Sequence, residues 1–249
     1  MVNTFKLSVG AALLSTALVS ALAPSASAFN FTPRETGEID VGLGCITGQC
    51  LDVSSMFDSI VSLEDASSGN RSRLFVDYFG TGDTNAVFEN DEEKVVFKTR
   101  DKGTNSAGYW FRPSEYNEFT KEAEEQGQLE VGTYQFNFAQ TMAELSIDFF
   151  DTESFPTTGV LEINGVALDP ADAYLAKGRD GNIQTMRFEN VDSIVMKLGR
   201  DSPSGTGDGV NFRMSGTPVE TPEPTVLLGL LVVAGSGATL KKRAQAVAS

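Results

Sequence analysis

The feature that most restricts the fold of this chain is a series of short runs in which apolar and polar residues alternate. Alternation with a period of two gives each run one buried side and one solvated side, as in a β-strand. The alternating apolar residues are Tyr134, Phe136, Phe138, Leu145, Ile147, Phe149, Met186, Phe188, Ile194, Met196, Leu198, Val210, Phe212 and Met214. Asn164-Gly165 separates two apolar runs, which predicts a two-residue hairpin turn. Short strands separated by turns predict a β-sandwich or jelly-roll-like domain.

The first half of the chain has weaker patterns. EKVVFKTR (93–100) and AGYWFRP (107–113) are typical of strands, and the turn-like SSGN (67–70) favours strands on either side of it. The best helix candidate is PSEYNEFTKEAEEQG (113–127), because Ser114 can cap it, acidic residues crowd its first half and a glycine ends it. We therefore expect a mainly β domain with one short helix.

The N-terminus has the pattern of a signal peptide. Met1–Lys6 carries one positive charge, an apolar stretch follows to about Ala23, and Ala26 and Ala28 supply the small residues that signal peptidase requires. Cleavage after Ala28 would leave Phe29 as the first mature residue. An uncleaved N-terminal anchor is the alternative, and in both cases the chain is exported.

The C-terminus has an apolar run, Thr225–Leu240, of 16 residues without charge. As a helix it would span roughly 24 Å, which is a little less than the roughly 30 Å thickness that about 20 residues cross in a bilayer. Its apolar residues cover every face, which is not the pattern of an amphipathic core helix. The basic residues that follow, Lys241, Lys242 and Arg243, favour the cytoplasmic side. We expect a transmembrane helix with the folded domain outside.

These signals divide the chain into four parts. We expect a signal peptide over 1–28, a β-sandwich extracellular domain over 29–214, a Pro/Thr-rich linker over 215–224, and the apolar helix with its basic tail over 225–249.

The end of the chain resembles a known sorting signal. Pro222-Glu223-Pro224, the apolar run and the basic cluster stand in the order that is typical of PEP-CTERM proteins. The resemblance implies that a membrane enzyme, exosortase, processes the tail near the motif and that the protein reaches the cell surface or extracellular matrix. It also implies Gram-negative bacteria that make exopolysaccharide, which would be a possible partner. Leu129-Glu130-Val131-Gly132 resembles the LEVG motif of one group of these proteins.

The charge of the mature segment limits its partners. Without the two terminal segments, residues 29–224 hold 15 basic and 34 acidic side chains, a net charge of −19. Nucleic acids and anionic lipids both require positive charge, so neither is expected to bind. The acidic surface favours solubility and loose binding of divalent cations.

Cys45 and Cys50 are the only cysteines, and the chain has no histidine. A close pair in an exported protein indicates a disulfide, which at this loop length contributes about 2 kcal/mol. A zinc site would need two more soft ligands, and a thioredoxin-like motif would need two intervening residues in place of the four present.

Catalytic sites are restricted by elimination. The lack of histidine excludes Ser–His and Cys–His pairs, and no Gly-rich phosphate loop precedes a helix. Carboxylates remain, chiefly Asp148, Asp151 and Glu153 in IDFFDTE, with Asp208 in a later acidic loop. They suit a solvated strand end, a calcium site or, less well, the carboxylate pair of a glycoside hydrolase. We expect that the protein is not an enzyme and requires no cofactor, and that calcium is the candidate ion if one binds.

Two neighbouring aromatic residues, Tyr109 and Trp110, could stack on sugar rings. Consecutive residues of a strand face opposite ways, so at least one of the two is expected in the core. The sequence thus predicts a non-enzymatic, exported surface or matrix protein, with a carbohydrate-binding module as the first alternative and a carboxylate-based glycoside hydrolase as the second.

Overall fold

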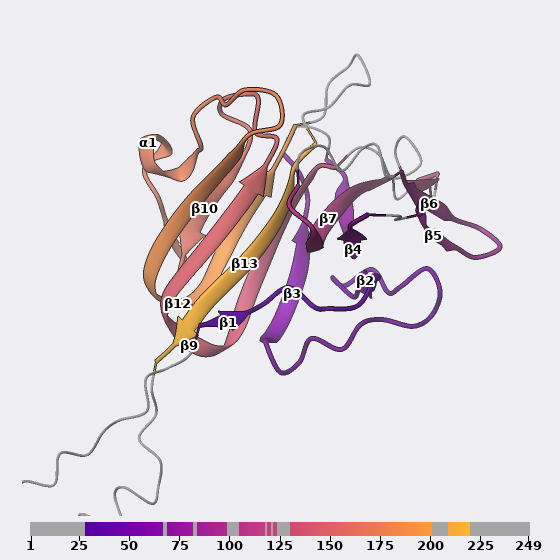
Figure 1. Cartoon of the computed structure of the whole chain (residues 1–249), viewed down its shortest axis with the longest axis horizontal. Coiled ribbons are helices and arrows are strands. Elements are labelled where there is room, and N and C mark those ends of the chain that lie inside the picture. Colours follow the sequence, from indigo (N-terminus) through magenta and orange to yellow (C-terminus); the bar gives the residue numbers. More distant parts are fainter. Residues whose placement is uncertain are drawn as a thin grey trace, which may run out of the picture.

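A computed structural model describes residues 28–66, 69–81, 84–98, 105–117, 119–120, 122–123, 130–200 and 209–219 (Figure 1). In chain order its elements are β1 (Phe29–Asn30), β2 (Gly37–Ile39), β3 (Phe57–Leu63), β4 (Arg71–Phe79), β5 (Ala86–Glu89), β6 (Lys94–Phe97), β7 (Gly108–Asn117), β8 (Glu122–Ala123), β9 (Gly132–Phe150), β10 (Gly159–Ile163), β11 (Val166–Ala167), α1 (Pro170–Ala173), β12 (Ile183–Leu198) and β13 (Asn211–Pro218). The predicted mainly β fold is confirmed.

Eleven of the described strands form one antiparallel sheet. Its main path runs β11-β10-β12-β9-β13-β7-β4-β2, while β3 adds to β9, β1 to β13 and β8 to β7. The other two strands, β5 and β6, form a separate hairpin, which projects to one side of the molecule in Figure 1.

The sheet turns a corner in the middle of β9. One edge of β9 pairs with β12 along almost its whole length. The other edge pairs first with β3, over Thr133–Phe138, and then with β13, over Met142–Phe150. The exchange of partners takes place around residues 139–141, which we call the corner, and a register shift in β12 between Val191 and Ser193 faces it. One continuous sheet, and not two separate ones, therefore supplies both walls of the main core.

Two hydrophobic clusters fill the domain. The large one lies between the two arms of the sheet, which are the part where β9 pairs with β3 and the part where β9 pairs with β13. Its buried side chains include Phe136, Phe149, Ile194 and Phe212. The small one comprises Ile46, Phe75, Phe88, Val95, Phe97 and Ala123, and it packs the β5–β6 hairpin against the outer face of β4. The alternating residues of the sequence thus mark mainly the large cluster.

The helix predicted over 113–127 is wrong. Pro113–Asn117 is the second half of β7 and pairs with β4, and β8 then pairs back onto the end of β7. Ser114, the predicted cap, is fully buried, and Glu115 is 1% exposed. Cross-strand pairing and burial outweigh the local helix preference of these residues.

The helix that does form is α1, a single turn. Asp169 caps it by accepting a hydrogen bond of 3.0 Å from the N–H of Ala171, and Pro170 suits its first position. Among the described residues, α1 is the only helix, and nothing helical there is long and apolar enough to cross a membrane.

Two further predictions concern turns and boundaries. The Asn164-Gly165 hairpin is confirmed, because β10 and β11 pair as Ile163 with Val166 and both turn residues have positive φ, 52° and 74°. Strand β13 continues to Pro218 and stays paired with β9, so it extends beyond residue 214, where the domain was expected to end. The Pro/Thr composition concealed the end of a paired strand.

Candidate functional site

An acidic cluster lies at the end of the sheet where β9 stops and β12 begins. One carboxylate oxygen from each of Asp151, Glu153 and Asp180 lies within 4.8 Å of the others. Asp151 follows β9 with φ of 61°, and its Oδ1 accepts a hydrogen bond of 2.7 Å from the N–H of Gly181. This bond joins the loop after β9 to the turn before β12. Oxygen ligands from two loops suit calcium chemically.

The predicted calcium ligands are only partly brought together. Asp151 and Glu153 share the cluster, but Asp148 forms an ion pair of 2.8 Å with Arg213 and accepts a hydrogen bond from Thr185. Asp208 lies outside the described residues. Asp180 was missed, although the RDGN turn at 179–182 that carries it is a visible turn signal in the sequence.

The predicted aromatic platform is changed by burial. Trp110 is 1% exposed, donates its indole N–H to the carbonyl of Ser106 at 2.8 Å, and packs against Phe150 and the guanidinium of Arg213. It therefore offers no face to a sugar. Tyr109 is half-buried and lies across from Tyr78, which is 39% exposed, with ring centroids 5.0 Å apart.

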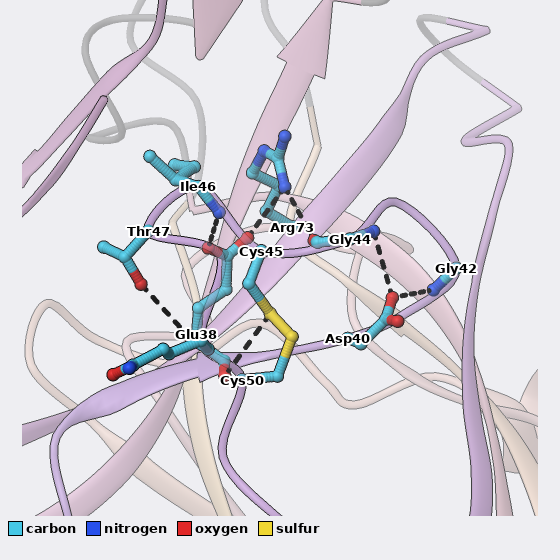
Figure 2. Close-up of a disulfide and its surroundings, with 10 residues drawn as sticks. Glu38, Asp40, Gly42, Gly44, Cys45, Ile46, Thr47, Cys50 and Arg73 are labelled. Carbon is cyan, nitrogen blue, oxygen red and sulfur yellow. Dashed lines mark hydrogen bonds and ion pairs between the residues drawn. A yellow bond between two sulfur atoms is a disulfide. The ribbon is translucent and has the colours of Figure 1, made fainter. Parts of the chain in front are cut away.

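The disulfide, formed by the half-buried Cys45 and the exposed Cys50, borders a buried polar centre around Glu38 and Arg73 (Figure 2). Cys45 and Cys50 are bonded, which confirms the predicted pair. Within the loop that they close, the N–H of Ile46 donates to one carboxylate oxygen of Glu38 at 2.6 Å, and Arg73 binds the other oxygen at 2.8 Å. Burial raises the pKa of Glu38, although these donors oppose the effect.

Arg73 extends this centre to the hairpin. Its guanidinium donates to the carbonyl of Gly44 at 3.0 Å and to both carboxylate oxygens of Glu93, at 2.9 and 2.8 Å. The side chain of Asn90 donates to the carbonyl of Ile46 at 2.9 Å. The disulfide loop therefore connects β2 and β4 to the β5–β6 hairpin.

The described part of the LEVG-like motif lies in the interior. Glu130 is 5% exposed and contacts Arg112, which also forms an ion pair of 2.9 Å with Asp77. The second carboxylate oxygen of Glu130 accepts a bond of 3.1 Å from Asn211. A side chain at Gly132 would meet atoms of Tyr134 and Ser72 at 2.7–2.8 Å. The motif therefore has a packing role at the start of β9, and residue 129 lies outside the described residues.

The two ends of the described domain meet at the corner. Phe29 pairs with Gly216 and Asn30 with Ser215, so β1 lies along the end of β13. Beyond β13, the N–H of Val219 donates to the carbonyl of Thr141 at 2.8 Å. In Figure 1, β1 and the end of β13 lie side by side low in the view, whereas α1 lies near the top.

The other predicted signals lie outside the described residues. These are Ala26, the Pro222-Glu223-Pro224 motif, the Thr225–Leu240 run and the basic cluster Lys241, Lys242 and Arg243, whereas Ala28 is the first residue described. No protein-family model, curated protein or solved structure matches this chain.

Proposed function

We propose that this chain is an exported, non-enzymatic surface or extracellular-matrix protein whose PEP-CTERM-like tail directs its sorting. The observation that carries the proposal is the pairing of the first and last strands of the described domain, β1 and β13. β1 starts directly after the predicted signal cleavage site and pairs with β13, which ends at Pro218, just before the motif. Loss of residues 1–28 and of the tail would leave every described strand intact.

The tail is proposed to act in two steps. The apolar run and its basic cluster first hold the chain in the inner membrane, with the domain outside. Pro222-Glu223-Pro224 then lies just outside the bilayer, where exosortase can reach it. The two prolines disfavour helix there and keep the backbone extended for a protease groove.

Three properties of the domain support this destination. The Cys45–Cys50 disulfide suits an oxidising compartment, and the strong negative charge suits a soluble surface protein. The two arms of the sheet around one core support a β-sandwich-like module, an architecture common outside the cell. Calcium held by Asp151, Glu153 and Asp180 is a proposed, optional addition.

The sorting proposal is tested by changing Pro222, Glu223 and Pro224 together to Ala in a host that has exosortase. Membrane insertion should persist, because the apolar run is untouched, and uncleaved protein should accumulate in the inner membrane. The control changes Glu220 and Thr221 to Ala and should be cleaved at the wild-type position, so that its mature mass differs from that of the wild type only by these two substitutions. Surface delivery of the motif variant, cleaved at the wild-type position, would show that Pro222, Glu223 and Pro224 do not direct sorting.

Carbohydrate binding is the second candidate, supported by the Tyr78–Tyr109 pair and its partial exposure. Stacking of a sugar on this pair would make Tyr78→Ala bind exopolysaccharide from the host roughly fivefold more weakly in affinity electrophoresis. Phe119→Ala removes a ring that is 96% exposed elsewhere on the domain and serves as the control. Equal mobility of both variants and the wild type would remove this candidate.

A further inference from the structure

The described domain ends three residues before the proposed processing motif. Val219 is fixed to the corner by its hydrogen bond to Thr141, and only Glu220 and Thr221 separate it from Pro222. Three Cα-to-Cα steps of about 3.8 Å limit the distance between Val219 and Pro222 to about 11 Å. Any protein that encloses the motif must therefore also lie against the corner.

The corner presents a shaped surface at this position. A surface hollow of about 600 Å³ opens there, and Val219 forms part of its wall. The other lining residues come from β3, β9 and β12: Asp58, Asn137, Phe138, Ala139, Gln140, Thr141, Asp192 and Ser193. Most of these side chains bear carboxylate, amide or hydroxyl oxygens, which accept hydrogen bonds. A partner surface that offers Arg, Lys or amide donors would complement them.

The motif stays near the corner because β13 is firmly attached to the sheet. β13 pairs with β9 through Pro218, and β1 covers its end by pairing with Ser215 and Gly216. The motif therefore cannot move away from the corner unless this end of the sheet opens. A long free linker would have separated the two.

We propose that the corner hollow docks against the outer face of the membrane protease that processes the tail, so that the enzyme recognises the folded domain together with the motif. This inference rests on the proposed sorting function. It adds that Asp58 and its neighbours contribute to the rate of processing. The opposite end of the domain, with α1 and the acidic cluster, points away from the enzyme.

The test follows processing of the full chain by pulse-chase in a host with the sorting enzyme. Asp58→Lys reverses an exposed charge in the hollow and should slow processing about fivefold or more. Asp172→Lys makes the same charge change on α1, at the far end, and should process at the wild-type rate. Gln140→Lys, also exposed in the hollow, gives a second reading should Asp58→Lys fold poorly.

A spacer separates docking from a general effect of charge. About 12 Gly and Ser residues inserted after Val219 add roughly 20 Å of reach. In that background Asp58→Lys should process as fast as its own parent chain, because the corner no longer has to contact the enzyme. Equal processing rates for the wild type and all three Lys variants without the spacer would overturn the docking proposal. So would an Asp58→Lys variant that is slowed by the same factor with the spacer as without it. The Ala variant of Pro222, Glu223 and Pro224 reports separately on the sorting proposal itself.

Discussion

The two hydrophobic clusters of the domain are stabilised by different means. The large cluster lies between the arms of one bent sheet, and its residues come from long paired strands that bury aromatic and aliphatic side chains together. The small cluster lies under the β5–β6 hairpin, which has no ladder to the main sheet among the described residues. Around it stand Arg73, Arg112 and the disulfide loop.

The difference shows how a small apolar surface is supplemented. A few side chains bury too little area to hold a hairpin in place by the hydrophobic effect alone. Buried arginines supply the remaining connections, since each binds two carboxylates and stacks on a ring, Arg73 on Tyr116 and Arg112 on Phe97. Such centres specify position, but they leave uncompensated charge when one partner is lost.

The largest expected effect is in the large cluster. Phe136→Ala should lower the free energy of unfolding by about 3–5 kcal/mol, because a fully buried ring leaves a cavity between the arms. Urea unfolding, followed by far-UV circular dichroism, should show the whole domain losing stability in one transition. A variant that loses only the β5–β6 hairpin would contradict the assignment of Phe136 to the shared core.

A similar loss is expected around the small cluster. Arg112→Ala leaves the buried carboxylates of Asp77 and Glu130 without their cationic partner. The free energy of unfolding should therefore fall by about 3–5 kcal/mol. The control is Lys94→Ala, since Lys94 and Glu89 form an exposed pair worth at most about 1 kcal/mol. If both variants unfold at the same urea concentration, the buried ion pairs do not stabilise this region.

The disulfide should have a smaller and more local effect. Changing Cys45 and Cys50 together to Ser should cost about 2 kcal/mol, because the closed loop is short. Hydrogen exchange should accelerate in β5 and β6, since the loop holds Ile46 in the small cluster. If hydrogen exchange in the hairpin does not accelerate selectively and stability falls uniformly over the domain, the disulfide acts only by restricting the unfolded chain.

The smallest effect concerns calcium at the acidic cluster of Asp151, Glu153 and Asp180. Millimolar calcium should stabilise the domain by about 1–2 kcal/mol if the site has the affinity of extracellular modules. Asp151→Asn should abolish the rise in Tm, and it keeps a residue that tolerates the left-handed backbone at 151. Asp58→Asn is the control. A Tm that responds equally in all three proteins would indicate non-specific screening.

Local patterns in the sequence were sufficient for several features. Alternation marked β9, β12 and β13 because each has one side in the large cluster. Asn164-Gly165 specified its hairpin, since both residues tolerate positive φ. Cys45 and Cys50 are too close along the chain for their pairing to depend on the rest of the fold. Each of these features is decided within a few neighbouring residues.

Other features depended on contacts between distant segments. Ser114 and Glu115 are in a strand because β4 pairs with them, despite a helical local pattern. Asp180 joins Asp151 only because β9 and β12 pair over their length. The buried role of Glu130 depends on Arg112 and Asn211, which lie 18 and 81 residues away along the chain. Composition and local spacing carry no record of such partners, so only the tertiary structure could assign them.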